Sequence, residues 1–200
     1  MLTTNDIALK EWAVICRELE AGRQVVLLRK GGIRDQSRGF SVDHAEFFLF
    51  PTYVHENEDE LTGAARPLLA EVERAAPSAG QVRLGLYAEV DHVTEVQDLE
   101  VLRRLDGLHA LAWPAVERRF HYRRPGLHVI TLRVHRLLRP LSIPSLARYD
   151  GCRSWVPLGM PLPVAGAEPV LNEQAFARSV TAVRQALVET AREKSVPRRG

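Results

Sequence analysis

Two stretches of alternating residues constrain the fold of this chain more than any other feature. From Val82 to Val90 apolar side chains recur at every second position. Within the longer run from Leu127 to Leu138, apolar residues at 130, 132 and 134 alternate with polar ones at 131, 133 and 135. A period of two places one set of side chains on each face of a β-strand. The sequence therefore predicts two strands with one buried face each.

Helical and turn signals surround these two strands. We predict a helix over residues 5–20, strands over 24–29 and 46–50 joined as a long-looped hairpin, and further helices near 58–75, 98–105 and 115–122. A last strand follows near 152–156, and apolar residues at helical spacing after residue 170 predict a C-terminal helix. The expected fold class is α+β, with a mixed or antiparallel sheet of four or more strands, flanking helices and a C-terminal helix.

Length and composition favour one domain. A chain of 200 residues with 46% hydrophobic content buries on the order of 70% of its unfolded surface without a disulfide or structural metal. We expect a single α+β domain over residues 1–160, then a linker, the C-terminal helix and a frayed tail over 161–200. No apolar run approaches the roughly 20 residues of a membrane helix, so we expect a cytoplasmic protein without membrane contact. Cofactors and oligomeric state are left open, and no metal ligand is assigned.

The basic residues are unevenly distributed. Between residues 117 and 139 the chain carries seven arginines and one acid, whereas residues 43–60 hold six acids and no lysine or arginine. A basic stripe that neutralises phosphates is typical of proteins that bind DNA or RNA. An arginine-rich solvated surface explains the same composition. The candidate phosphate contacts are Arg118, Arg119, Arg123, Arg124, Arg133 and Arg136.

A second candidate is a ligand-binding loop at Lys30-Gly31-Gly32. Lys30 is one of only three lysines among 27 basic residues, and a compact ammonium suits a phosphate contact or proton transfer. The motif lacks the remaining glycines and the Ser or Thr of a P-loop, and a tight turn alone also explains the two glycines. Trp155 beside Arg153 offers a ring and a charge to the same ligand.

A third candidate is catalytic. His44 and Glu46 lie two residues apart in the strand that leads to Phe50, and His55 follows the end of that strand. Two imidazoles and a carboxylate suit an acid/base pair or a divalent metal. Surface histidines paired with neighbouring acids explain the pattern as well.

Four segments together resemble a known family. The strings ALKEWAVICRELEAGRQVVLLRKGGI (8–33), HAEFFLFPTYVHE (44–56), LHVITLRVHRLLRPLSIP (127–144) and YDGCRSWV (149–156) are similar to the bacterial domain of unknown function family 1802, over roughly residues 8–160. Some relatives are joined to an Mrr-type restriction endonuclease domain, so the resemblance implies a role in restriction, defence or another nucleic-acid process. No lysine here has an acid two positions before it, as a conventional nuclease of that class requires.

Three hypotheses follow. The first is a nucleic-acid-associated accessory or binding module, in which the arginine stripe contacts phosphates while the Lys30 loop and Trp155 approach a base. The second is an enzyme that acts on a phosphate-containing substrate through His44, Glu46, His55 and Lys30. The third is a protein-interaction subunit whose acidic and basic regions bind partners. We favour the first.

Overall fold

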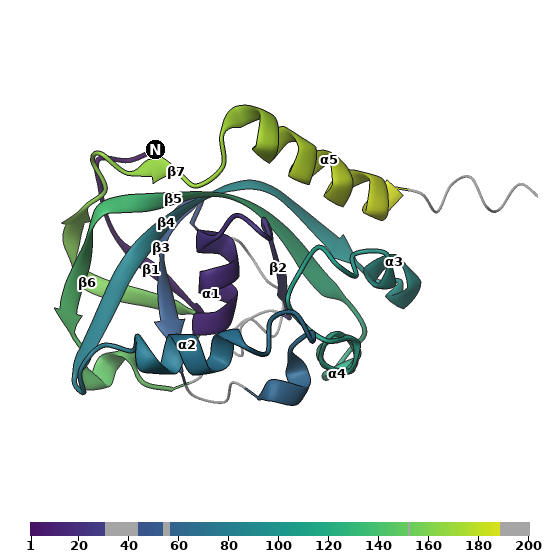
Figure 1. Ribbon diagram of the computed structural model, residues 1–200, viewed down its shortest axis with the longest axis horizontal. Coiled ribbons are helices and arrows are strands. Elements are labelled where there is room, and N and C mark those ends of the chain that lie inside the picture. The colour runs from purple at the N-terminus through teal and green to yellow at the C-terminus, as the bar shows by residue number, and fades with distance from the viewer. Residues whose placement is uncertain (31–43, 54–56, 152, 189–200) are drawn as a thin grey trace, which may run out of the picture.

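One mixed β-sheet with helices packed around it forms the protein, as a computed structural model shows (Figure 1). The structure describes residues 1–30, 44–53, 57–151 and 153–188. The strands are β1 (Thr4–Trp12), β2 (Val26–Arg29), β3 (Glu46–Thr52), β4 (Gln81–Val96), β5 (Leu127–Pro144), β6 (Trp155–Pro163) and β7 (Glu168–Pro169). The helices are α1 (Ala13–Glu20), α2 (Leu68–Arg74), α3 (Leu99–Arg103), α4 (Trp113–His121) and α5 (Glu173–Val188), and Glu58–Glu60 and Ala147–Tyr149 are short 3₁₀ turns.

The strands are ordered β2-β5-β4-β3-β1-β6, and β7 pairs with β5. Among the strand pairs that the described residues form, β1–β3 is parallel and the others are antiparallel. The long β4–β5 ladder shifts register twice, between Leu84 and Leu86 and between Val90 and His92, and such bulges bend and twist a sheet. The α+β class, the mixed sheet and the C-terminal helix predicted from the sequence are confirmed.

The helix predicted over residues 5–20 is wrong in its first half. Residues Thr4–Trp12 form β1, which lies between β3 and β6, and the helix begins only at Ala13. Each side of β1 therefore hydrogen-bonds to a neighbouring strand. Long-range pairing thus overrides the local helical spacing of its apolar residues.

The predicted hairpin of residues 24–29 with 46–50 is also wrong. The first strand, β2, pairs with β5 at one edge of the sheet, whereas β3 lies between β4 and β1. Val26, Leu27 and Leu28 are all buried. When both faces of a strand are buried, side-chain contacts with the elements that cover those faces stabilise it. The next strand along the chain therefore need not be its hydrogen-bonding partner.

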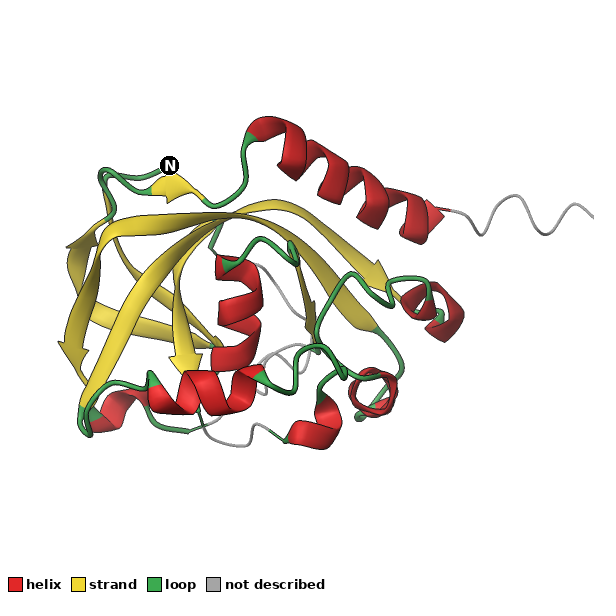
Figure 2. Ribbon diagram, viewed as in Figure 1, coloured by secondary structure: helices red, strands yellow, loops and turns green. Residues whose placement is uncertain are grey.

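Two apolar clusters stabilise the sheet, one on each face. The larger contains α1, α2, α3 and α4 packed against β2, β3 and β5, and the smaller contains Phe48, Tyr87, Val156 and Leu158 among others. Figure 2 shows α1 beneath the arch that β4 and β5 form. Both faces of β3 are covered from Phe47 to Phe50, so close packing fixes this part of the strand.

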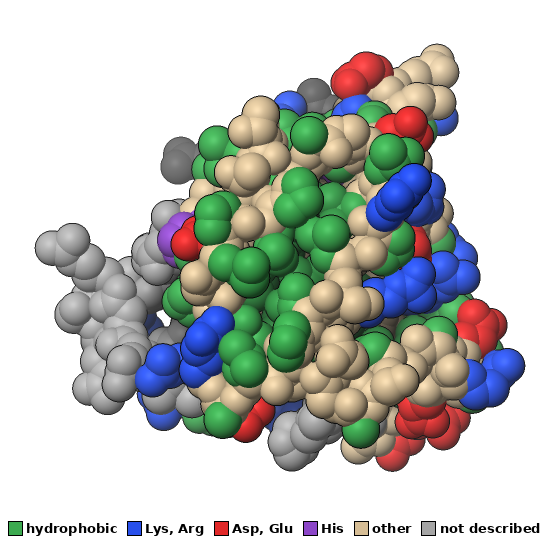
Figure 3. Space-filling model, turned by 90° about the vertical axis from the view of Figure 1, so that its left-hand side faces the viewer, with side chains coloured by type: hydrophobic (Ala, Val, Ile, Leu, Met, Phe, Trp, Pro, Cys, Tyr) green, Lys and Arg blue, Asp and Glu red, His purple; other side chains and the backbone are tan. Residues whose placement is uncertain are grey.

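The segment after residue 160, expected to be a linker, adds the end of β6 and all of β7 to the sheet. Strand β6 stands at the end of the strand order, on a side of the molecule where hydrophobic side chains gather (Figure 3). Its three prolines, at positions 157, 161 and 163, cannot donate a backbone hydrogen bond and so disfavour further strand pairing. Over the described residues, no helix is both long and apolar enough to cross a membrane.

Candidate functional site: a basic cleft

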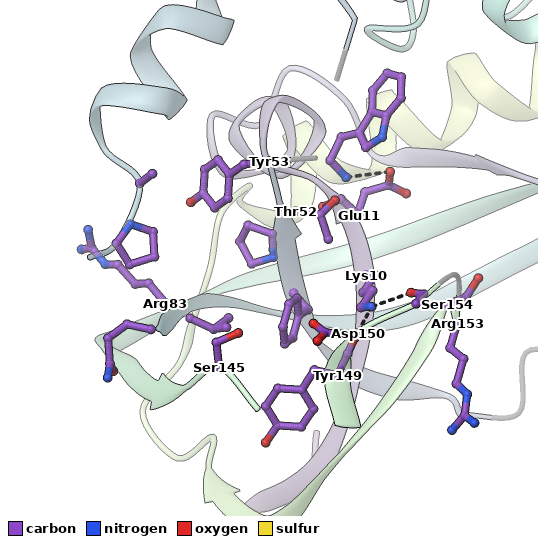
Figure 4. Close-up of a pocket in the computed structure, with 18 of the residues that line it drawn as sticks. Lys10, Glu11, Thr52, Tyr53, Arg83, Ser145, Tyr149, Asp150, Arg153 and Ser154 are labelled. Atoms are coloured by element: carbon purple, nitrogen blue, oxygen red, sulfur yellow. Dashed lines mark hydrogen bonds between the residues drawn. The ribbon is translucent and has the colours of Figure 1, made fainter. Parts of the chain in front are cut away.

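A cleft of about 770 Å³ opens at the edge of the sheet where β1, β2 and β3 end. Because β1 and β3 run parallel, in a register that places Trp12 opposite Thr52, their last residues reach the same edge. Figure 4 shows residues at the ends of these strands beside Tyr149 and Asp150. The start of β4, the segment before it and Arg119 of α4 complete the walls.

The lining of the cleft is strongly cationic. Six basic and two acidic side chains contribute to it, and they come from five separate segments of the chain. The basic residues are Lys10, Arg29, Lys30, Arg83, Arg119 and Arg153, and the acids are Glu11 and Asp150. Walls with an excess of one sign of charge concentrate ligands of the opposite sign, so the cleft favours anions.

Glu11 is the buried acid of this site. Its side chain is only 5% exposed, and its Oε2 accepts a hydrogen bond of 2.8 Å from Nη1 of Arg29. The same guanidinium nitrogen donates to the carbonyl oxygen of Lys10 at 3.0 Å. A buried carboxylate requires such a partner, because burial of an unpaired charge is costly. The pair therefore fixes β1 to β2 but leaves little charge on Arg29 for a ligand.

Both lysines of the cleft are held by backbone carbonyls. Nζ of Lys10 donates to the carbonyl oxygens of Tyr149 and Gly151. Nζ of Lys30 donates to that of Phe120, in the last turn of α4, and to those of Arg124 and Gly126, which follow the helix. Burial, and then the charge of Arg124, lower the pKa of Lys30. These ammonium groups anchor loops that form the walls of the cleft.

Three arginines remain available to a ligand. Among the described residues, no carboxylate lies within ion-pair distance of Arg83, Arg119 or Arg153, although all three line the cleft. The guanidinium of Arg119 lies 4.8 Å from the ring centre of Trp12, and burial lowers the pKa of this group. Arg83 and Arg153 are exposed. The charges of Glu11 and Glu60 act on Arg119 without direct contact, so its guanidinium keeps donors with which to bind a phosphate or carboxylate.

Aromatic rings form part of the same walls. Phe50 and Tyr149 are buried and meet edge to face with ring centres 5.8 Å apart, so they form the hydrophobic floor. Trp12 and Tyr53 are partly exposed, and Tyr53 shows 38% of its surface. Because Trp12 pairs with Thr52 across β1 and β3, Tyr53 is only one residue beyond that pair.

The structure divides the predicted arginine stripe. Arg119 lines the cleft, whereas Arg118 is not part of its lining and pairs with Glu60. Arg123 stacks on Tyr122, 5.3 Å from the ring centre, and the carbonyl of Arg124 accepts a hydrogen bond from Lys30.

Arg133 and Arg136 lie outside the cleft, on β5. Arg133 pairs with Glu173 at the start of α5 at 2.5 Å and lies 4.6 Å from the ring centre of Phe176. Arg136 lies 3.8 Å from the Glu20 carboxylate and donates to its carbonyl oxygen at 2.9 Å. Both arginines thus connect β5 to neighbouring elements, and the stripe is not one continuous surface.

Among the predicted ligand contacts, Lys30 and Arg153 line the cleft, and Gly31 and Gly32 lie outside the described residues. Trp155 adjoins the cleft residue Ser154, but its ring packs edge to face on Phe47 and His44, each with a centre distance of 5.0 Å. The described part of this group therefore lies at or beside one cavity.

The two predicted catalytic residues that the structure describes, His44 and Glu46, contact different groups. His44 packs against Trp155, whereas Glu46 accepts hydrogen bonds from the Leu2 backbone and the Tyr87 hydroxyl at 2.7 and 2.9 Å. Burial would raise the pKa of Glu46, but these two bonds and the Met1 ammonium outweigh it and lower the pKa. His55 lies outside the described residues. Across the described ranges, no group of three His, Cys, Asp or Glu side chains could hold a metal ion.

Sequence reasoning missed Lys10, Glu11, Trp12, Arg29, Tyr53 and Arg83, which the cleft brings together. The predicted helix placed Trp12 in the core and gave no role to its neighbours. The sequence carried little signal for this group, because the helical spacing of the apolar residues between 8 and 19 hid the strand end at which Lys10, Glu11 and Trp12 lie.

The family comparison agrees with the resemblance noted in the sequence. The family described as "Domain of unknown function (DUF1802)" matches residues 8–182. The chain belongs to this family. The match extends through most of α5, beyond the residue 160 expected from the sequence.

The solved structures with similarity to this chain include two crystal structures of the ZmASCH protein from Zymomonas mobilis. One is a Tyr-to-Phe mutant, 12% identical, with a TM-score of 0.44 over 88% of this chain and 96% of that one. The other is a Ser-to-Ala mutant, also 12% identical, with a TM-score of 0.42 over 90% and 98%. No protein with a curated description matches this chain.

Proposed function

We propose that this DUF1802 protein is a nucleic-acid-binding module and that the basic cleft is its binding site. The observation that carries the proposal is the cationic excess of the cleft, in which Arg83, Arg119 and Arg153 contact no described carboxylate. Phosphate contacts supply most of the affinity of proteins for DNA and RNA. The proposal also includes a role in restriction or defence, which the family resemblance implies.

The three arginines differ in the contact that they offer. Arg83 and Arg153 are exposed at the rim and attract phosphates at long range. Arg119 is partly buried, and its orientation is set by Trp12, so its side chain loses less conformational freedom on binding. We expect Arg119 to set the position of one phosphate and the rim arginines to hold the neighbouring ones.

The test compares two double variants that each remove two exposed positive charges. R83Q/R153Q changes the rim of the cleft. R139Q/R178Q changes two exposed arginines outside the cleft lining that contact no described acid. A fluorescently labelled 20-mer oligonucleotide is titrated at salt concentrations from 50 to 300 mM, and log affinity is plotted against log salt.

The rim variant should lower the magnitude of the salt slope by about 1.4 on a single strand or about 1.8 on a duplex, as the loss of two phosphate contacts requires. The control variant should leave the slope unchanged. Equal changes in both variants, or no binding of any oligonucleotide by the wild type at 50 mM salt, would refute the cleft as a nucleic-acid site.

The enzyme hypothesis lacks a comparable arrangement. His44, Glu46 and Lys30 each contact a different set of groups, and no interaction among the described residues joins any two of them. The acidic and basic sectors of the protein-interaction hypothesis are also partly neutralised within the chain, since Glu60 pairs with Arg118. Neither alternative has an observation that favours it over the cleft.

A further inference from the structure

The three available arginines of the cleft differ in depth. Arg83 and Arg153 are exposed, and Figure 4 shows them on opposite sides of Lys10. Arg119 is partly buried, and its guanidinium lies 4.8 Å from the ring centre of Trp12. Burial is the main cause of its lowered pKa. The cleft therefore has one partly desolvated positive charge within its walls and two solvated ones at its rim.

The charged groups that act on Arg119 are already paired with one another. Two acids and two arginines influence its guanidinium, and they form the ion pairs Glu11–Arg29 and Glu60–Arg118. Each pair is neutral as a whole, so neither removes the charge of Arg119. A contact between opposite charges is stronger in such a partly desolvated position than in water. Arg119 thus offers its charge and its donors to an anion that enters the cleft.

The size of the cleft limits the ligand that can reach this inner charge. Its volume of about 770 Å³ lies within the roughly 300–1,000 Å³ of sites that enclose small molecules. Lys10 holds one wall through the carbonyls of Tyr149 and Gly151, and Lys30 holds another through that of Phe120. The cleft therefore encloses a ligand of the size of a nucleotide rather than a length of polymer.

A phosphate monoester suits this position better than a phosphodiester. A phosphate inside a strand carries one negative charge, and the strand continues from it on both sides. A monoester carries about −1.5 to −2 charges at pH 7 and three acceptor oxygens, to which a guanidinium donates through two parallel N–H bonds. Because a monoester ends the chain, it can enter a recess that the strand does not have to leave again.

We propose that the cleft binds the phosphate monoester of a nucleotide, with the phosphate on the Arg119 guanidinium and the nucleotide enclosed by the walls. Two sources present this group: a free mononucleotide and the phosphorylated end of a strand. In the second case Arg83 and Arg153 at the rim attract the remaining phosphates of the strand. This inference rests on the proposed function and adds the part of a nucleic acid that the site takes.

The test uses single-stranded 12-mers of one sequence, each made as DNA and as RNA and labelled on an internal base so that both ends are free. One strand carries a 5′-phosphate, one a 3′-phosphate, and one has hydroxyls at both ends. At one salt concentration the wild type should bind at least one phosphorylated strand about 10-fold or more tightly than the hydroxyl strand, which is the size of one charge-assisted hydrogen bond.

Two single variants place the preference on the inner arginine. R119Q removes its charge, and R118Q removes the charge of the neighbouring residue, which is not part of the lining. R119Q should bind the phosphorylated and the hydroxyl strands equally, whereas R118Q should keep the wild-type ratio. The rim variant R83Q/R153Q should bind both strands more weakly and keep the ratio too. Circular dichroism and the unfolding midpoint verify that the variants fold.

Competition separates the two sources of the monoester. The adenosine monophosphate with the preferred phosphate position, adenosine and inorganic phosphate are each titrated against the bound strand. The monophosphate should displace the strand at lower concentrations than the other two. Competition as tight as the binding of the strand identifies a free nucleotide as the ligand, and weaker competition identifies the end of a strand.

The outcomes also separate this inference from the proposed function. Equal affinity of the wild type for the phosphorylated and the hydroxyl strands would overturn the inference and leave the nucleic-acid function in place. The same follows if R119Q keeps the preference, or if inorganic phosphate competes as well as the monophosphate does. Absence of binding to every probe would overturn both.

Discussion

Lys30 offers the sharpest test of the structure, because the sequence favours a ligand contact and the structure gives the side chain three internal partners. The substitution Lys30→Met keeps the length and flexibility of the side chain and removes the ammonium. The carbonyls of Phe120 and Gly126, partly buried at 2.8 and 2.7 Å from Nζ, then lose their donor. The carbonyl of Arg124 is exposed, and water replaces the lysine there.

The expected loss follows from the two partly buried bonds. A hydrogen bond to a charged group contributes about 1.5 kcal/mol at the lower end of its range, so two of them contribute about 3 kcal/mol. The side-chain entropies of Lys and Met are similar and cancel. For a chain of this length about 1 kcal/mol changes the unfolding midpoint by roughly 2–4 °C, so K30M should unfold about 6–12 °C below the wild type.

Urea unfolding followed by circular dichroism gives the free energy, and a thermal scan gives the midpoint. The matched control is Arg153→Met, which removes one positive charge from the same cleft at an exposed position without described contacts; it should change stability by less than about 0.5 kcal/mol. If K30M is as stable as this control, the contacts of Lys30 with the end of α4 do not support the fold.

Three further predictions concern the core and the cleft. Burial lowers the pKa of His109 to about 4, so between about pH 4 and 6.5 the folded protein binds fewer protons than the unfolded chain and is destabilised as the pH falls. In urea unfolding, the wild type should lose about 2 kcal/mol more than H109Q between pH 6.5 and 5, and parallel losses in the two proteins would contradict the assignment. Replacing Glu11 with Gln leaves the partly buried Arg29 charge without its carboxylate and should lower the free energy of unfolding by about 3 kcal/mol. A loss below about 1 kcal/mol would show that the pair is solvated. Gly22 has a φ of +69°, and a Cβ there would meet a leucine carbon at 2.6 Å. G22A should therefore lower the free energy of unfolding by about 1–2 kcal/mol or more in denaturant titrations. G63A, at a position with open space around it, serves as the control, and equal stabilities of the two variants would refute the argument.

The parts of the fold that could be predicted are those with a strong local pattern. The patterns at residues 82–90 and 127–138 correctly predicted the strands β4 and β5. The single buried face expected of each strand is wrong, because both strands contribute side chains to the apolar clusters on the two faces of the sheet. Strand β1 could not be predicted in this way, because its apolar residues match a helical spacing and its partners are about 40 and 150 residues away.

The candidate site was predicted only in part for the same reason. Arg119, Lys30 and Arg153 were identified individually by charge or rarity, but the cleft that unites them depends on the parallel pairing of β1 with β3. That pairing also brings Trp12 and Tyr53 into the walls. Arg133 belonged to the same basic stripe in the sequence, but the position of Glu173 at the start of α5 directs it to an ion pair.

Photochemical crosslinking tests most directly whether the cleft is where nucleic acid binds. A single-stranded oligonucleotide bound to the wild-type protein is irradiated, the protein is digested, and the crosslinked peptides are identified by mass spectrometry. We predict crosslinks in the peptides that contain Trp12, Tyr53 and Arg153. Crosslinks confined to the peptides of β5 and α5, around Arg133 and Arg136, would place the nucleic acid on the opposite surface and contradict the assignment of the cleft.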